Sequence, residues 1–157
     1  MNTPDKNATG TSNAIPVGDI IEMGYKITPN VTKWGFVYST SQVNAVDTVE
    51  SAQAYLDSKG IKYESATVET SADVKSAAET LISKGCDVIF VPNDAIVQDG
   101  VQSLSQVCEE AKIPTYCSSA TTVNNGCLAT LAIDDKGIGA KTADKCIEYM
   151  NGKAGQR

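Results

Sequence analysis

The chain has 157 residues, of which 41% are apolar and 20% are charged, and its net charge is −6. This length suits one ordinary domain with a sizeable core, and the scattered Lys and Arg residues exclude the clustered basic patch that a nucleic-acid or anionic-membrane surface needs. No apolar run approaches the roughly 20 residues of a membrane span, and residues 1–7 lack the basic stretch and apolar core of a signal peptide.

The sequence contains no histidine, which removes Ser-His-Asp and Cys-His catalysis and His-ligated metals. The five cysteines have no C-x-x-C spacing, which argues against a zinc or thioredoxin-type site. We expect buried free thiols that pack as small hydrophobic side chains, at least one of them unpaired within the chain. The five are Cys86, Cys108, Cys117, Cys127 and Cys146. We therefore predict a protein with no metal, no cofactor and no catalytic residues.

The first half of the chain alternates between helical and strand patterns. From Pro16, apolar residues recur at helical spacing until Pro29 ends the pattern. Trp34–Tyr38 is typical of a buried strand, and the helical pattern after it stops at Gly60. Residues 62–68 alternate like a strand, and Ser71 is the expected N-cap of a helix that Gly85 closes.

The second half continues the alternation. Val88–Val91 is a continuous apolar run of the kind found in sheets covered on both faces, and a helix with its apolar stripe from Val97 to Ala111 follows. Pro114–Cys117 is the expected fourth strand, and Cys127–Ile133 is the fifth, after a loop that contains Asn124-Asn125-Gly126. The last helix covers about Asp135–Met150. We expect it to bury Ile138, Ala143, Cys146, Ile147 and Met150.

Strictly alternating strands and helices with short connections imply parallel pairing through right-handed crossovers. The sequence therefore predicts an α/β fold with a doubly wound, five-stranded parallel sheet in the flavodoxin-like order 2-1-3-4-5. We expect residues 14–153 to form one α/β ligand-binding lobe, between a flexible segment over residues 1–13 and a tail over residues 154–157.

Small polar residues stand at the end of each strand-like run, just before a helical pattern begins. In an open α/β sheet, ligands bind outside the carboxyl ends of the strands, where helix N-termini offer free N–H groups. We therefore predict a small-molecule binding face along this edge of the sheet. The polar groups are Ser39-Thr40-Ser41, Glu69-Thr70-Ser71, Pro92-Asn93-Asp94, Ser118-Ser119 and Asp134-Asp135.

Two kinds of ligand group fit this edge. The hydroxyls of residues 39–41, with the N–H groups of the following helix, can receive a carboxylate or a phosphate. Asp94 and Asp134 can each accept hydrogen bonds from an ammonium, so a zwitterion suits the site. Capping of the last helix is an equally good interpretation for Asp134 and Asp135, and for Ser71 capping is the favoured one.

Other common sites are not indicated. The P-loop pattern and the Rossmann G-x-G-x-x-G are both absent. A receiver-type phosphoacceptor pocket needs acids after the first strand, where this chain has only hydroxyl residues. A small enzyme would need Ser39 or Cys117 as its nucleophile, and no histidine is present to activate either.

Four stretches, in order and spacing, carry a resemblance to a known family. Ser41-Gln42-Val43-Asn44-Ala45 is similar to the family's S-E-A-N-S loop, and Val91-Pro92-Asn93-Asp94-Ala95 is similar to its V-P-T-D-N loop. Residues 29–38 are similar to the entry into its second lobe, and residues 126–139 to its final strand and last helix. From about Thr9 to Lys153 the chain resembles the substrate-binding proteins of ABC importers, in the group that includes tryptophan and tyrosine binders.

The resemblance implies one lobe of a type I periplasmic-binding-protein-like fold, which closes around its ligand between two lobes. It implies that residues 1–13 include the crossover from a first lobe that this chain does not contain. It also implies that Asn44, Asp94 and the Ser118-Ser119 pair face the ligand. Gln42, Ala45 and Asn93 replace the family's Glu, Ser and Thr, and so change the hydrogen bonding beside the cleft. The parent protein is then expected to be exported, to the periplasm or as a membrane-anchored lipoprotein at the cell surface.

The leading hypothesis is a fragment of the solute-binding component of an ABC importer, which binds a small polar ligand non-covalently. An amino acid, including an aromatic one, is the expected ligand, and the permease subunits are the expected partners, with no nucleic acid and no membrane insertion of this chain. The expected ligand-binding residues are Ser39, Thr40, Ser41, Asn44, Asn93, Asp94, Ser118, Ser119 and Asp134. The alternative is a ligand-sensing effector domain of a transcriptional regulator or a signalling receptor, because the same fold serves there.

Overall fold

The protein is described by a computed structural model that covers residues 11, 14–132 and 134–151. The chain divides into two compact units. One consists of residues 15–132, and the other combines residues 1–14 with residues 133–157. The unit that contains the sheet ends at Ala132, and the lobe expected over residues 14–153 stays a prediction. The two units are therefore treated separately.

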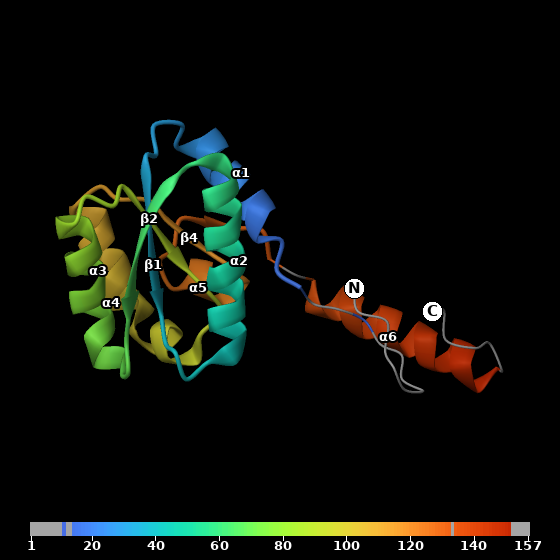
Figure 1. Cartoon of the computed structure of the whole chain (residues 1–157). Coiled ribbons are helices and arrows are strands. Elements are labelled where there is room, and N and C mark those ends of the chain that lie inside the picture. Colours follow the sequence, from blue (N-terminus) through green and yellow to red (C-terminus); the bar gives the residue numbers. More distant parts are fainter. Residues whose placement is uncertain (1–10, 12–13, 133, 152–157) are drawn as a thin grey trace. The chain divides into compact units, whose positions relative to one another are not determined.

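Residues 15–132 are built around a five-stranded parallel sheet with the strand order β2-β1-β3-β4-β5, as predicted. The neighbouring strands lie side by side through the middle of this unit (Figure 1). The strands are β1 (Lys33–Tyr38), β2 (Lys62–Thr67), β3 (Val88–Val91), β4 (Thr115–Cys117) and β5 (Ala129–Thr130).

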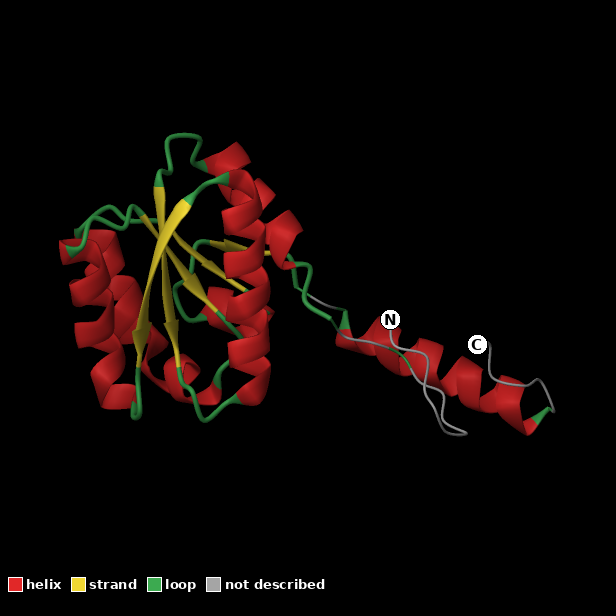
Figure 2. Cartoon of the chain, in the orientation of Figure 1, coloured by secondary structure: helices red, strands yellow, loops and turns green. Residues whose placement is uncertain are grey.

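Helices cover both faces of the sheet (Figure 2). On one face lie α1 (Val17–Ile27) and α2 (Val43–Lys59), which pack against the fully buried Trp34 and Phe36 of β1. On the other lie α3 (Val74–Ser83) and α4 (Ala95–Glu110), which pack against Val37 of β1. Successive side chains of a strand point to opposite faces, so the continuous apolar runs of β1 and β3 supply both cores at once.

The predicted helix stop at Gly60 is confirmed. Gly60 adopts a φ of 67° and a ψ of 25°, and its N–H group donates to the carbonyls of Leu56 and Asp57 at the end of α2. This left-handed conformation costs glycine little and a residue with a Cβ more.

The predicted N-cap at Ser71 is wrong by one residue. Thr70 precedes a short 3-10 helix, η1 (Ser71–Asp73), which leads into α3. The Asp73 carboxylate accepts hydrogen bonds from the backbone N–H of Thr70 at 3.1 Å and from its hydroxyl at 2.7 Å. The carboxylate three residues on therefore decides where the turn begins, in the manner of a capping box.

The segment from residue 118 to residue 132 differs from its prediction. Part of the expected loop forms a short helix, α5 (Ala120–Asn124), and β5 is only two residues long. Ile133, the expected end of the fifth strand, lies outside the described residues. Only Ala129 and Thr130 find partners, Tyr116 and Cys117, because β4 is itself short.

The last helix, α6 (Asp135–Met150), has the predicted bounds but not the predicted packing. None of its residues is buried, and Ile147 and Met150 are 56% and 83% exposed. Cys146 is exposed as well, whereas the other four cysteines are buried free thiols as expected. The apolar pattern therefore identified the helix correctly but not its burial.

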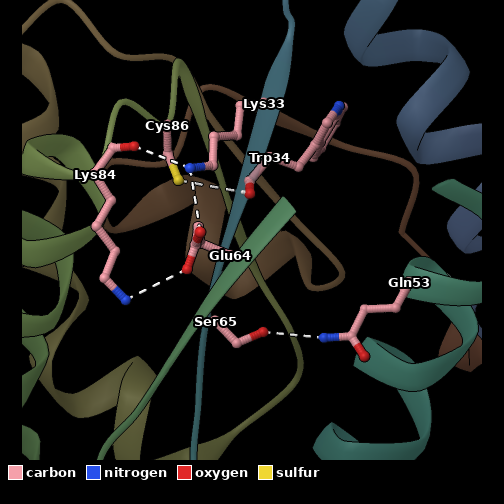
Figure 3. A network of polar contacts seen from close by, with 7 residues as sticks. All are labelled: Lys33, Trp34, Gln53, Glu64, Ser65, Lys84 and Cys86. Atoms are coloured by element: carbon pink, nitrogen blue, oxygen red, sulfur yellow. Dashed lines mark hydrogen bonds and ion pairs between the residues drawn. The ribbon is translucent and has the colours of Figure 1, made fainter. Parts of the chain in front are cut away.

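Polar contacts hold the edge strand β2 from both of its faces (Figure 3). The Glu64 carboxylate pairs with Lys33 Nζ at 3.2 Å and with Lys84 Nζ at 3.3 Å. On the next residue, Ser65 Oγ accepts a hydrogen bond from Gln53 Nε2 of α2 at 3.0 Å. A charged edge strand of this kind discourages pairing with a further strand.

Candidate functional site

The carboxyl ends of β1, β3 and β4 bring three of the predicted polar loops to one edge of the sheet, because these strands are neighbours. Two contacts join the loops directly. The backbone N–H of Ser39 donates to Asp94 Oδ2 at 2.6 Å, and that of Ser118 donates to the carbonyl of Val91 at 3.1 Å. Asp134 belongs to the other unit, where it precedes α6.

Asp94 is fully buried, and three backbone N–H groups occupy its carboxylate. Oδ1 accepts from Ile96 at 2.9 Å and from Val97 at 3.2 Å, which caps α4, while Oδ2 accepts from Ser39. Buried carboxylates persist where hydrogen bonds replace their lost hydration. The carboxylate that was expected to meet an ammonium therefore holds the end of β1 against the start of α4.

The serine-rich loop after β1 is bonded within itself. Ser39 is buried, and its Oγ lies 2.7 Å from Ser41 Oγ and accepts the Ser41 N–H at 3.3 Å. Gln42, not one of the hydroxyl residues, is the N-cap of α2, and it makes no side-chain capping bond. Thr40 and Ser41 are exposed at this edge. The hydroxyls are thus not used up in capping the helix.

Two amide side chains, those of Asn44 and Gln98, donate to Asn93, and the bond from Asn44 links the loop after β1 to the loop after β3. Asn44 Nδ2 donates to the backbone carbonyl of Asn93 at 2.6 Å. Gln98, on the first turns of α4, donates from Nε2 to Asn93 Oδ1 at 2.7 Å. Both asparagines were predicted as ligand-binding residues, but Gln98 was not, since a glutamine five residues after Asn93 matches no motif. We call Ser39, Asn44, Asn93, Asp94 and Gln98 the polar rim.

The loop after β4 contributes less than expected. Ser118 is buried, and its hydroxyl makes no hydrogen bond to any of the described residues. Ser119 is the N-cap of α5 and makes no side-chain capping bond, while its carbonyl accepts from Cys117 Sγ at 3.3 Å. Among the described residues, neither serine makes a side-chain hydrogen bond to the polar rim.

Three of the four buried thiols, those of Cys86, Cys108 and Cys127, are poor nucleophiles, whereas a hydrogen bond with Cys127 lowers the pKa of Cys117. Burial raises the pKa of Cys108 to about 12 and also raises the pKa of Cys86. A hydrogen bond with Cys117, together with burial, raises the pKa of Cys127. Thiols with raised pKa values stay protonated at neutral pH, and the thiolate is the reactive form. Among the described residues, no group of three or more acidic or cysteine side chains is placed to hold a metal ion.

A shallow hollow of about 380 Å³, which no sequence pattern indicates, lies at the opposite, amino edge of the sheet. Its acidic residue, Asp87, already accepts hydrogen bonds from the Thr32 N–H, the Thr32 hydroxyl and the Lys33 N–H. The Asp87 carboxylate therefore holds the start of β1, and we regard the polar rim as the better candidate for a ligand site. It is lined by Ile27, Thr28, Pro29, Asn30, Val31, Asp87 and Pro114.

Comparison with known families decides the class of the protein. The family described as "ABC transporter substrate binding protein" matches residues 1–156. The chain belongs to this family. It is a family of solute-binding proteins rather than of enzymes, and its members are typically extracellular or periplasmic. A regulatory effector domain is accordingly not favoured for this substrate-binding protein. In the part of it that the structure describes, no helix combines the length and apolar character needed to cross a bilayer.

Individual relatives agree with the family. The chain is 31% identical over 154 residues to a tyrosine-binding protein of Clostridioides difficile. The matched region covers 98% of this chain and 44% of the relative. It is similar to the crystal structure of a conserved domain protein of Vibrio cholerae, with a TM-score of 0.79 and 34% identity. This match covers 96% of the present chain and 50% of the Vibrio cholerae chain. It is also similar to an ABC domain of Streptococcus pneumonia in complex with L-Trp, with a TM-score of 0.77 and 29% identity. This match covers 93% of the present chain and 49% of the Streptococcus pneumonia chain. The chain thus spans about half the length of these relatives.

Proposed function

We propose that this chain is one ligand-binding lobe of the solute receptor of an ABC importer. In this proposal a second lobe completes the site, and the closed receptor delivers its ligand to permease subunits in the membrane. The whole protein is then exported, to the periplasm or as a lipoprotein on the cell surface. The family match over residues 1–156 supports the class, and coverage of about half of each relative supports the single lobe.

We propose an amino acid, including an aromatic one, as the ligand. The observation that carries this is the polar rim, in which the exposed side chains of Asn44 and Asn93 stand at the carboxyl edge of the sheet and the one carboxylate, that of Asp94, is buried. The names of two relatives, a tyrosine-binding protein and a complex with L-Trp, support the same class.

The predicted site residues take different parts in this proposal. Thr40, Ser41, Asn44 and Asn93 are exposed and contact the ligand. Ser39 and Asp94 are buried and hold the loops in place. Ser118, Ser119 and Asp134 stay predictions as ligand contacts.

Binding is tested by NMR titration of the chain with L-tryptophan and L-tyrosine, with sucrose and glucose as controls. We expect shifts confined to the loops after β1 and β3. We expect affinities in the millimolar range, because one lobe offers only part of the contacts and no closure. No shift at these loops with any of the twenty amino acids, or a preference for the sugars, would contradict the proposal.

A further inference from the structure

We infer that Gln98 is a positioning residue that orients the amide of Asn93 so that its NH₂ group is presented to the ligand's carboxylate. This inference rests on the proposed function and names the part of the ligand that this lobe recognises. Gln98 is half-buried on α4 and contacts Asn93 through its own amide. It is absent from the set of ligand-binding residues that the sequence predicted.

The orientation follows from which atoms are already in use. Gln98 Nε2 donates to Asn93 Oδ1 at 2.7 Å, so the single side-chain acceptor of Asn93 faces Gln98. The backbone carbonyl of Asn93 accepts from Asn44 Nδ2 at 2.6 Å. A carboxamide has one oxygen acceptor and an NH₂ group with two donors. With one acceptor site of its oxygen taken by Gln98, Asn93 presents its NH₂ group, with both donors unused, to a ligand.

The same count gives Asn44 the opposite polarity. Its NH₂ group is used on a carbonyl, which can only accept, so the orientation of this amide is fixed and Asn44 Oδ1 remains as an acceptor. The rim therefore offers donors at Asn93 and an acceptor at Asn44, side by side. A carboxylate suits the first and an ammonium suits the second.

The charged residue of the polar rim does not supply this discrimination. The only carboxylate of the polar rim, that of Asp94, is buried and bonded to three backbone N–H groups. Two neutral amides, held in fixed orientations, thus distinguish the two ends of an amino acid on this lobe. Gln98 fixes one of the two.

The test compares Gln98→Glu with wild type, using L-tryptophan and L-tryptophanamide as probes in NMR titrations of the whole chain. At neutral pH a glutamate can only accept, so Asn93 must turn its NH₂ group toward residue 98 and its oxygen toward the ligand. We expect the Kd for L-tryptophan to rise about tenfold, the loss of one hydrogen bond to a charged group. We expect the Kd for L-tryptophanamide, which can donate to the reversed Asn93, to change less than threefold.

Gln102→Glu is the matched control, because Gln102 is exposed one turn further along α4 and the change in charge is the same. It should leave both affinities unchanged. Gln98→Leu removes the hydrogen bond to Asn93 without reversing its direction, so it should weaken the binding of both probes about equally. Circular dichroism checks that each variant is folded.

Two results separate the inference from the proposed function. Suppose that wild type binds L-tryptophan, but that Gln98→Glu changes the Kd values of both probes equally or changes neither. Gln98 then does not orient Asn93. If wild type binds neither probe, the proposed function fails and the inference fails with it.

Discussion

At the scale of single residues, Asp94 shows how one buried carboxylate can organise an edge of the sheet. Its carboxylate receives N–H groups from two different loops, so the end of β1 and the start of α4 share one acceptor. The side chain is conspicuous in the sequence for its charge. In the structure it accepts hydrogen bonds from three backbone N–H groups, which would otherwise lack a partner.

Replacing Asp94 tests this role. In Asp94→Asn one oxygen becomes an NH₂ group, which cannot accept, so the N–H of Ser39 or those of α4 lose their partner. We expect the free energy of unfolding to fall by about 1–3 kcal/mol, measured by urea denaturation. Asp99→Asn, at an exposed position on the same helix, should change it little. Equal stabilities of the two variants would contradict the role.

Gly24 tests the packing of the core on the α1 face. A Cβ atom built on Gly24 lies 2.9 Å from Trp34 Cη2 and 3.3 Å from Tyr116 Cε2, and both rings are fully buried. Gly24→Ala should therefore destabilise the protein by about 1–3 kcal/mol in thermal or urea unfolding, through overpacking. Gly139→Ala meets no atom within 4 Å and should not destabilise it. A neutral Gly24→Ala would mean that the rings move aside freely.

At the scale of the elements, strands and helices are held by different means at the centre and at the edge of the sheet. Central strands β1 and β3 are buried on both faces, whereas β2 is exposed or half-exposed throughout. Ion pairs from Glu64 to Lys33 and Lys84 therefore contribute at the edge, where salt and solvent screen them.

The edge network predicts a pH dependence. Hydrogen bonds from Lys33, and then Lys84, lower the pKa of Glu64 below its ordinary value of 4.5. Because the folded-state pKa is the lower one, the contribution is complete above the unfolded-state pKa and is lost as the pH falls through the folded-state value. Glu64→Gln should lower the melting temperature at pH 7 in low salt, and the difference should shrink at pH 3 and in 1 M NaCl.

Glu69→Gln serves as the control for this prediction. Glu69 is exposed just after β2, and no hydrogen bond or ion pair to its side chain is found among the described residues. The same change of charge there should leave the melting temperature nearly unchanged at both pH values. A deficit of Glu64→Gln that is independent of pH and salt would show that packing, not charge, is lost.

At the scale of the whole molecule, stability should reside in residues 15–132. Every buried apolar residue of the described structure lies between Val17 and Cys127, and α6 buries none of its residues. Burial of apolar surface is the main favourable term in folding. The unit that contains the sheet therefore has its complete core without the rest of the chain.

A shortened chain tests this. A chain of residues 14–132 should unfold at the same urea concentration as the whole chain, measured by circular dichroism. A clearly lower midpoint would show that α6 stabilises the sheet. Thiol labelling gives an independent check, since Cys146 should react fast and the four buried cysteines should react only on unfolding. Cys146→Ser should abolish the fast reaction.

The candidate site was predictable only in part. The asparagines and the hydroxyls stand where strands end, so a pattern that runs along the chain finds them. The hydrogen bond from Gln98 to Asn93 joins residues 5 positions apart, and the bond from Ser39 to Asp94 joins residues 55 positions apart. No local sequence pattern predicts such pairs. Which atoms of the rim remain free for a ligand depends on these contacts.

The sequence by itself determined the strand order and the spans of the longer helices, because alternating apolar periods and glycine stops act through local geometry and right-handed crossovers. Only the tertiary structure decided that Asp94 is a buried clamp and that Thr70 rather than Ser71 caps its turn. Only it decided that the apolar residues of α6 stay exposed. The physical reason is the same in each case. A side chain's capacity to bond or to bury is written in the sequence, but whether that capacity is used depends on which partners the fold brings within reach.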